Sequence, residues 1–496
     1  YAQLDGAAYL PETHDYAHDL DIFGNASVYQ YINRTTSEQG NRLLAAWLLA
    51  PADVASIAAR QEAIKELAPR IEWRQQLQAG GMAEKIKQHT QHKLEGWIKE
   101  ENSFVNRPRW RVLRILLPGI ICTALVLNIA GMLPSPLFWG LVFIFFIISG
   151  AISRKVMPAY LQLDKIVKEI NTLRNSVAII ENQSFTSPLL KDLQSAFLSG
   201  AGRASTEVKE LKAILDRLDI RLNPLLFIPL NIFFFWDLQQ ILALEQWKER
   251  NQASLLRWFG TLAEIEVLCT LANLHANHPH WGFPAIVEAD GTFTAEALGH
   301  PLIDETKRVA SSFSTNGKPQ IALITGSNMA GKSTFLRSAG INIVLAMMGA
   351  PVCASSCRLS IMRVVSSMRI TDNLAESTST FYAELKKLKY IITAVNNQEK
   401  VFLLLDEILR GTNSLDRHTG SHALINQLIR HKAVGMLATH DLELARLAEE
   451  HPAYIHNYHF DVQVENEELY FDYKLKEGIC KSLNASILMK KIGIEL

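Results

Sequence analysis

The sequence has 496 residues, 48% of them hydrophobic and 20% charged, a composition that excludes a disordered, collagen-like or low-complexity chain. At about 150 residues per domain, the length predicts about three domains. The 50 basic residues balance 50 acidic ones, so the formal net charge is zero, which argues against a protein that holds nucleic acid by being basic overall.

Two apolar runs in the first third of the chain predict a helical hairpin. Residues 115–133 and 137–152 carry no formal charge, and a Pro-Ser-Pro turn joins them. At about 1.5 Å per residue the first run reaches about 28 Å, close to the roughly 30 Å hydrocarbon core of a bilayer, whereas the second is marginal at about 24 Å. A third apolar stretch, residues 222–236, is too short to span comfortably, and we expect it to be core or a surface that touches the bilayer.

Basic residues flank the hairpin on both sides, and its turn has none. They are Arg107, Arg109, Arg111, Arg114, Arg154 and Lys155. The positive-inside rule therefore predicts a transmembrane hairpin of the inner membrane with both ends in the cytoplasm, and the same collar favours anionic lipid head groups as a partner. The alternative is a hairpin buried inside a large cytoplasmic protein, which Pro118, Asn128 and the short second run favour.

A phosphate-binding loop follows a short buried-strand pattern in the second half of the chain. It has the pattern G-x-x-x-x-G-K-[ST], comprising Gly326, Ser327, Asn328, Met329, Ala330, Gly331, Lys332 and Ser333. A helical pattern over 334–348 comes next. The two glycines let backbone N–H groups face phosphates at a helix N-terminus. We expect Lys332 to reach the β- and γ-phosphates of ATP and the Ser333 hydroxyl to ligate Mg²⁺.

A second strand pattern ends in two carboxylates. The continuous apolar run 401–405 predicts a central parallel strand that delivers Asp406 and Glu407 to the carboxyl edge of the sheet. We expect Asp406 to hold the metal through water, and Glu407 to orient or deprotonate the attacking water. A helical segment over 417–431 and a further strand follow, and His440 at the end of that strand is expected near the γ-phosphate as a sensor or water-positioning group.

In these motifs the chain resembles the ATPase domain of the MutS family of DNA mismatch-repair proteins. The loop from Thr325 to Thr334 is similar to the family's T-G-P-N-M-x-G-K-S-T and differs at Ser327. Residues 406–413 resemble D-E-I-G-R-G-T-S, and residues 438–440 match A-T-H.

The resemblance extends to a signature segment and to upstream regions. Residues 379–384 resemble S-T-F-x-x-E, which implies a homodimer with two composite ATP sites, each taking its phosphate loop from one subunit and Ser379 from the other. Residues 478–485 resemble a stretch near the family's dimer contact. Segments between residues 33 and 64 and between 265 and 284 are similar to the opening and the end of the MutS core domain. The family inserts lever helices and a DNA-gripping clamp between them, where this chain has the apolar hairpin.

Together these features predict an α-helical core domain with a transmembrane hairpin, followed by an α/β phosphate-loop ATPase domain of ABC-like design. The predicted segments are 1–106 (first part of the helical core), 107–155 (hairpin with basic flanks), 156–285 (lever-like and core-like second part) and 286–496 (ATPase and dimerisation domain).

The first functional hypothesis is a membrane-anchored, dimeric ATPase that uses ATP and Mg²⁺ to change conformation on duplex DNA, as in mismatch repair. The alternative is a conformational ATPase of the same design that acts on a protein or lipid partner without DNA. A nucleotide-binding scaffold without turnover is disfavoured because both loop and carboxylate motifs are complete. No zinc site is expected: the five cysteines are scattered, and His275, His278 and His280 form a loop cluster that no carboxylate pattern completes.

Overall fold

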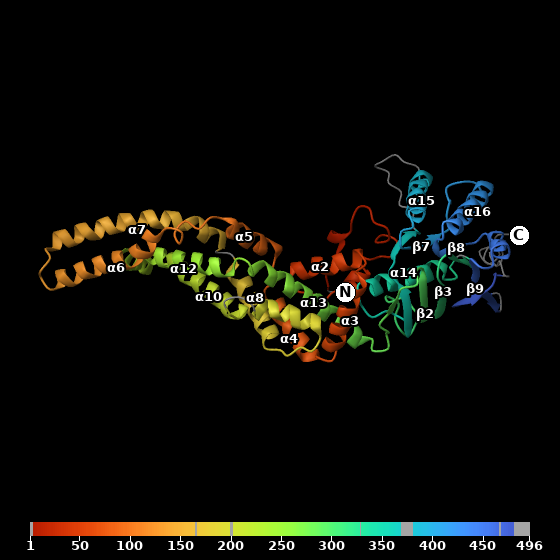
Figure 1. Cartoon of the computed structure of the whole chain (residues 1–496), viewed down its shortest axis with the longest axis horizontal. Helices are drawn as coiled ribbons and strands as arrows, with labels where there is room; N and C mark the ends of the chain where they lie inside the picture. Colours follow the sequence, from red (N-terminus) through yellow and green to blue (C-terminus); the bar gives the residue numbers. More distant parts are fainter. Residues whose placement is uncertain are drawn as a thin grey trace. The chain divides into compact units, whose positions relative to one another are not determined.

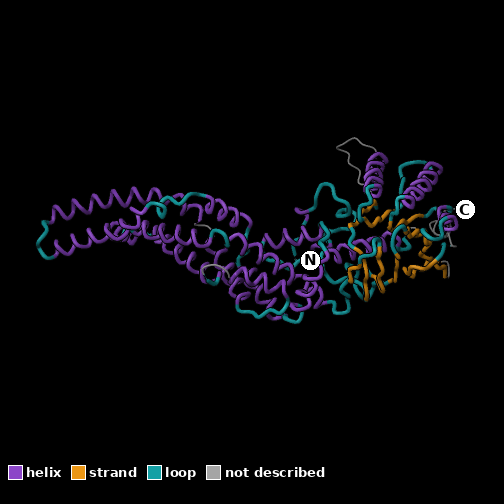
Figure 2. The backbone as a smooth tube through the Cα atoms, in the orientation of Figure 1, coloured by secondary structure: helices purple, strands orange, loops and turns teal. Residues whose placement is uncertain are grey.

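The computed structural model describes residues 3–163, 166–198, 202–327, 329–368, 380–465 and 468–480. The chain divides into two compact units. Unit 1 comprises Tyr1–Asn33, Leu44–Pro69 and Leu268–Leu496, and unit 2 comprises Arg34–Leu43 and Arg70–Val267. Figure 1 shows the helices and strands coloured from the N-terminus to the C-terminus, and Figure 2 shows which segments are helix, strand or loop. The two units are defined by the contacts within each of them. They do not test the boundaries of the four predicted segments, which stay predictions.

Unit 2 is built from helices joined by turns and loops, and its described residues contain no strand. The helices include α4 (Ile71–Ala83), α5 (Gln88–Lys99), α6 (Pro108–Ile129), α7 (Ser135–Leu163), α8 (Val167–Glu181), α9 (Pro188–Leu198), α10 (Ala204–Leu218), the 3-10 helix η3 (Asp219–Leu222), α11 (Pro224–Phe234) and α12 (Trp236–Asn251). The α10 sequence shows why: its buried residues Val208, Leu211, Leu215 and Leu218 recur at spacings of three and four, the period of a helix with one apolar face. Helices α2 (Glu38–Leu49) and α13 (Leu255–Asn277) contribute residues to both units.

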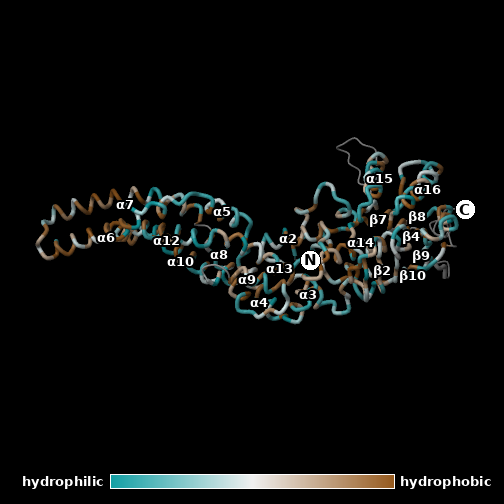
Figure 3. Tube along the Cα trace, in the orientation of Figure 1, coloured by the Kyte–Doolittle hydropathy of each residue, from teal (hydrophilic) through white to brown (hydrophobic). Residues whose placement is uncertain are grey.

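The hairpin predicted from the apolar runs is present as α6 and α7. Both helices are long and apolar enough to cross a membrane, by length and composition. Figure 3 shows the hydrophobic colour along both helices, and much of this surface is exposed, with Phe143 63% and Ile129 77% accessible. Asn128 closes the turn, since its amide donates to the carbonyl oxygen of Leu133 at 2.9 Å. The second helix is longer than its uncharged run, because α7 continues past Arg154 to Leu163.

Two buried charged residues of α12 hold the segment that leads into the hairpin. The Glu245 carboxylate accepts hydrogen bonds from the backbone N–H groups of Ser103, Phe104 and Val105 at 2.9, 2.9 and 2.7 Å. The Lys248 ammonium donates to the carbonyl oxygens of Trp97 and Glu100 at 2.7 and 2.5 Å. Buried backbone groups are costly to leave unpaired, so these bonds fix where α6 starts.

Unit 1 contains a six-stranded sheet in the order β10-β9-β4-β8-β7-β6. Its strands are β4 (Gln320–Thr325), β6 (Arg363–Ser367), β7 (Val401–Asp406), β8 (Val434–Thr439), β9 (Ile455–Glu465) and β10 (Glu468–Glu477). Neighbours pair in parallel except for β10, which is antiparallel to β9. Strands β4, β7 and β8 are buried at every position, as the continuous apolar runs predict for central parallel strands.

Helices cover both faces of this sheet. Leu403 and Leu405 share a buried cluster with Ile391 of α15 (Thr380–Asn396) and Ile425 of α16 (Ser414–Arg430). The other face meets α14 (Lys332–Met347), where a Cβ at Gly340 would lie 2.6 Å from the side chain of Leu404. Helix α16 begins three residues before the predicted segment because the Asn413 side chain caps it, accepting from the N–H of Asp416 at 2.9 Å.

A smaller sheet lies in the same unit, in the order β1-β5-β2-β3. Its strands are β1 (Ala285–Val287), β2 (Thr292–Leu298), β3 (Ser311–Asn316) and β5 (Ser356–Ser360). The remaining helices in the described part of this unit are α1 (Val28–Ile32), α3 (Val54–Leu67), α17 (Leu447–Glu450) and the 3-10 helices η1 (Ala7–Tyr9) and η5 (Leu444–Arg446). The described residues therefore form a helical region and then a mixed α/β region, as expected.

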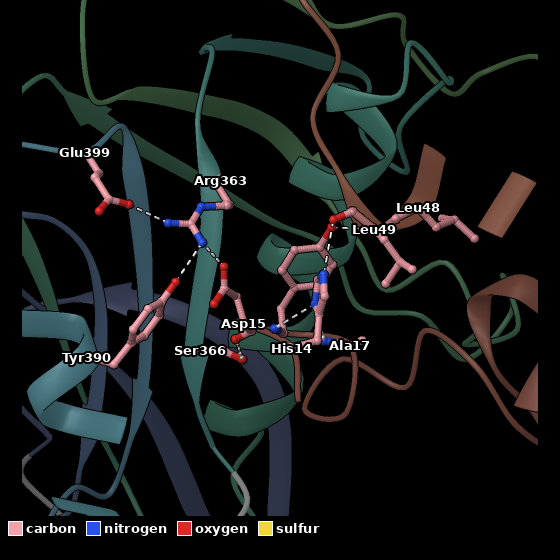
Figure 4. A network of polar contacts seen from close by, with 10 residues as sticks. His14, Asp15, Ala17, Leu48, Leu49, Arg363, Ser366, Tyr390 and Glu399 are labelled. Atoms are coloured by element: carbon pink, nitrogen blue, oxygen red, sulfur yellow. Dashed lines mark hydrogen bonds and ion pairs between the residues drawn. The ribbon is translucent and has the colours of Figure 1, made fainter. Parts of the chain in front are cut away.

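The N-terminal segment is joined to the six-stranded sheet by a polar network. Figure 4 shows the Arg363 guanidinium of β6 between the carboxylates of Asp15 and Glu399 and the Tyr390 hydroxyl. Nearby, the buried Asp19 accepts from Ser366 at 2.6 Å and pairs with Lys387 at 2.9 Å. Both networks link the start of the chain to β6 and α15, more than 300 residues later in the sequence.

Candidate functional site

The predicted phosphate loop connects the buried strand β4 to helix α14. Gly326 and Gly331 have backbone φ values of 147° and 110°, which residues other than glycine rarely adopt. A Cβ at Gly326 would also lie 2.8 Å from the carbonyl oxygen of Phe460. Met329 is 80% exposed and Ala330 is buried. Asn328, also predicted in the loop, lies outside the described residues.

Lys332, the first residue of α14, turns back onto the loop that precedes it. Its ammonium donates to the carbonyl oxygens of Gly326 at 2.7 Å and Ser327 at 2.9 Å. Burial lowers the pKa of this ammonium, and the nearby carboxylates of Glu407 and Asp406 raise it in part. The lysine thus lies on the inner side of the loop with its charge next to two acids.

Ser333 and Asp406 meet as the sequence predicts. The Ser333 hydroxyl donates to Oδ2 of Asp406 at 2.5 Å. The other carboxylate oxygen, Oδ1, is buried and has no hydrogen-bond partner among the described residues. Burial raises the pKa of Asp406, whereas the Ser333 hydrogen bond lowers it. A hydroxyl and a carboxylate oxygen without a partner are hard oxygen ligands, so this pair fits a Mg²⁺ ion.

Glu407 is held between two cationic or proton-donating groups. Its Oε1 lies 2.9 Å from Nδ1 of His440, and its Oε2 lies 3.2 Å from Nε of Arg410. The close contact with His440 lowers the pKa of Glu407, against the effect of burial. Glu407 also has a φ of 49°, in the left-handed region. The carboxylate is therefore ionised near neutral pH and fixed at the carboxyl ends of β7 and β8.

Arg410 is a site residue that sequence reasoning did not single out. Besides its contact with Glu407, its guanidinium donates to the Asp406 carbonyl oxygen at 3.3 Å and lies 3.9 Å from that residue's carboxylate. Glu384 of α15 accepts a hydrogen bond from the backbone N–H of Leu409, which fixes the same segment. The only sequence signal for Arg410 was its place in the segment 406–413. Ser379, predicted to act across a dimer, lies outside the described residues.

A cavity of about 190 Å³ opens beside the phosphate loop, and no sequence motif predicts it. Gly331, Thr334 and Phe335 line it from the loop and α14. Its other lining residues are Leu298, His300, Ile303, Lys307, Val309, Ser311, Ser338, Phe460 and Tyr473. Burial lowers the pKa of His300 to about 4, so this imidazole is neutral. Thr334, predicted only as the end of the loop, therefore connects the loop to a mostly apolar pocket.

Two clusters contain side chains of the metal-binding type. In the first, Glu305 joins His278 and His280 but not His275, so the expectation that no carboxylate completes the histidines is wrong for these two: His280 Nε2 lies 3.2 Å from Glu305 Oε1. His278 Nε2 instead lies 2.7 Å from the Tyr31 hydroxyl. In the second, His418 Nδ1 lies 2.7 Å from Asp441, with Glu443 nearby. These contacts are hydrogen bonds and ion pairs, and the absence of zinc stays a prediction.

Comparisons with known proteins match both halves of the chain. Residues 322–491 match the family model "MutS domain V" and residues 13–107 match "MutS domain III". A DNA mismatch repair protein MutS of Natronomonas pharaonis is 33% identical over 230 residues, which are 45% of this chain and 26% of that protein. The matched region thus spans about a quarter of that relative. The chain is thus similar to MutS proteins in these two domains and over the region shared with this relative.

Proposed function

We propose that the chain is an ATP-binding and ATP-hydrolysing protein that works as a homodimer. The observation that carries the proposal is the meeting of three features at one sheet edge: the glycine-rich loop, the Ser333–Asp406 pair and the Glu407–His440 pair. This is the placement that phosphoryl transfer to water requires, with phosphate binding, metal ligands and a water-orienting base side by side.

Lys332 and the loop supply phosphate binding in this proposal. On nucleotide binding the ammonium exchanges its hydrogen bonds to Gly326 and Ser327 for phosphate oxygens, and the N–H groups at the start of α14 face the same anion. Ser333 and Asp406 hold Mg²⁺, which when bound neutralises charge on the phosphates. Asn328 and Ala330 complete the loop.

Glu407 is proposed to orient and deprotonate the attacking water, with His440 and Arg410 fixing its carboxylate. The contacts at 2.9 and 3.2 Å limit the rotation of the side chain and keep it ionised. His440, at the end of β8, thereby serves as a positioning residue. Ser379 is proposed to complete the site of the partner subunit, as the resemblance of its segment implies.

The cavity beside the loop is proposed to take the nucleoside of ATP. Phe460 and Tyr473 provide aromatic faces, and Thr334 and Gly331 connect the pocket to the phosphates. Pockets for small ligands combine apolar and aromatic side chains with a few polar groups, as this cavity does. ATP bound in this way lies across the loop, with the base in the pocket and the phosphates at the start of α14.

Tyr473→Ala is expected to weaken nucleotide binding by about 2- to 13-fold, because an aromatic contact of this kind contributes about 0.5–1.5 kcal/mol. The matched control is Tyr473→Phe, which keeps the ring and should bind like the wild type. Titration of a fluorescent ATP analogue measures both. Equal affinity of all three proteins would remove Tyr473 from the nucleoside site.

The hairpin of α6 and α7 is proposed to anchor the protein in the inner membrane, with the ATPase in the cytoplasm. Its two helices are long enough and expose apolar side chains, and the six flanking basic residues suit anionic lipid head groups. The alternative location is the cytoplasm, with the hairpin covered by protein.

The dimer is proposed to bind duplex DNA in a mismatch-repair role, which its similarity to two MutS domains favours. The second candidate is an ATPase that acts on a protein or lipid partner, which the hairpin in place of a DNA clamp favours.

Binding of a labelled duplex to the purified dimer separates these two candidates. The DNA hypothesis expects binding at low salt that changes with ATP and falls steeply as salt rises, about 10³-fold between roughly 50 and 200 mM salt for about six phosphate contacts. A single strand and an ATP-free sample serve as controls. Lack of duplex binding at low salt, with ATP turnover intact, would leave the protein or lipid partner as the function.

A further inference from the structure

Helix α11, next to the hairpin, exposes an apolar surface that the rest of unit 2 does not cover. Residues 222–236 carry no formal charge. The exposed apolar side chains are Leu222, Leu225, Leu226, Ile228 and Phe234, and Leu225 is 86% accessible. A soluble surface rarely shows so many neighbouring apolar side chains. Helix α11 packs on α6 and α7, so this surface continues that of the hairpin.

The chain bends sharply at the end of α11. Phe235 has the left-handed conformation, with φ of 49° and ψ of 50°, and α12 leaves at 80° to α11. Taken as one span, the two helices would carry Glu245, Lys248 and other charged residues of α12 into the hydrocarbon, which is costly. At about 1.5 Å per residue α11 alone is about 16 Å long, too short to cross. Length and charge thus exclude a third span.

A buried polar network fixes α11 against α7. Asp237, fully buried, pairs with Arg221 at 2.8 Å and accepts from the Ser153 hydroxyl at 2.5 Å. Asn231 of α11 donates to the same hydroxyl at 2.9 Å. Removing one member of such a network leaves buried polar groups without partners. The helix is therefore held beside α7 and cannot swing away to cover its apolar face elsewhere.

The contacts of α11 also give its level along the hairpin. Ser153, which Asn231 contacts, directly precedes Arg154 and Lys155, the basic pair at the end of the uncharged run. Phe235 packs on Phe145, with ring centroids 5.5 Å apart. Phe145 precedes Ser153 by eight residues of α7, which places it about 12 Å closer to the hairpin turn. If the basic pair lies among the head groups, α11 lies between them and the outer part of the acyl chains.

We propose that α11 is a third membrane-contacting element, a short helix that lies in the head-group and acyl boundary of an anionic bilayer beside the spanning hairpin. This inference rests on the proposed membrane anchor. Lipid is the proposed occupant of this surface, because the apolar surface is continuous with that of the hairpin and Asn231 of α11 contacts Ser153, next to the basic pair Arg154 and Lys155. The element makes the anchor broad and fixes the rotation of the hairpin about its axis, which two helices alone do not fix.

Spin-label accessibility of the full-length protein in vesicles tests this directly. The vesicles contain phosphatidylcholine with a minority of phosphatidylglycerol. Cys122 and Cys269 are replaced by alanine. The three buried cysteines, Cys353, Cys357 and Cys480, are kept, and a sample without an added cysteine shows whether they react with the label. Single labels are placed at exposed sites of three kinds: Leu225 on α11, Phe143 on the hairpin and Met82 on α4. Collision with oxygen and with a water-soluble nickel complex reports depth.

The expected order is Phe143 deepest, Leu225 at the boundary and Met82 in water. A label at Leu225 that behaves like Met82 while Phe143 is deep would overturn the interfacial helix and leave the anchor standing. A label at Leu225 as deep as Phe143 would also overturn it. If Phe143 behaves like Met82, the proposed anchor itself fails, and α11 with it.

Discussion

Glu407→Gln is expected to bind ATP as the wild type does and to lose turnover by about 10²- to 10⁴-fold, the usual contribution of a general base. The amide keeps the size of the carboxylate but accepts no proton, and none of the contacts that hold phosphate in our proposal involves Glu407. Arg410 and His440 contact different oxygens of Glu407, at 3.2 and 2.9 Å, so the single amide oxygen of glutamine can replace only one of these two contacts. Phosphate release and fluorescent-nucleotide titration measure the two effects.

A nearby exposed carboxylate provides the matched control. Glu443 follows His440 by three residues and is exposed at the surface of unit 1. Glu443→Gln makes the same chemical change at a carboxylate outside the proposed site. The ATP turnover of this variant should match that of the wild type. Unchanged hydrolysis in Glu407→Gln would refute the role of Glu407 as the water-orienting base. Loss of nucleotide binding in that variant would place Glu407 in binding instead.

The parts of the site that the sequence predicted are those set by local pattern. Buried runs of apolar residues predict β4 and β7, and a strand-loop-helix order places Gly326 and Lys332 at one helix N-terminus. Parallel pairing then requires the carboxyl ends of β4, β7 and β8 to lie together, so the meeting of Ser333 and Asp406 follows. These steps need no knowledge of distant side-chain contacts.

The parts that it did not predict depend on contacts between distant segments. Phe460 and Tyr473 reach the cavity from β9 and β10, more than 120 residues after the loop, and no spacing rule connects them to it. The Asp15–Arg363 contact joins residues 348 apart. The helix α11 shows the same limit, because its sequence predicts either core or a lipid-facing surface, and only its exposed positions in the folded unit favour the second.

Replacement of residues 115–152 by a short glycine-serine turn is expected to move the protein from the membrane fraction to the soluble fraction. The segment exposes more than ten large apolar side chains, among them Ile129 and Phe143. At about 2 kcal/mol for each side chain taken from water, lipid stabilises the anchored state by on the order of 20 kcal/mol, which makes spontaneous release negligible. Fractionation of cells that express each protein measures this.

Extraction of the wild type separates a spanning hairpin from surface binding. The six basic flanking residues alone would hold the protein by charge, and such binding is screened by salt within a distance of about 10 Å or less. A spanning hairpin is instead expected to resist both high salt and alkali and to need detergent. Release by salt or alkali would therefore contradict the anchor. If the shortened protein is soluble and binds nucleotide with unchanged affinity, ATP binding in unit 1 is independent of the membrane, and the bilayer fixes only where the ATPase acts.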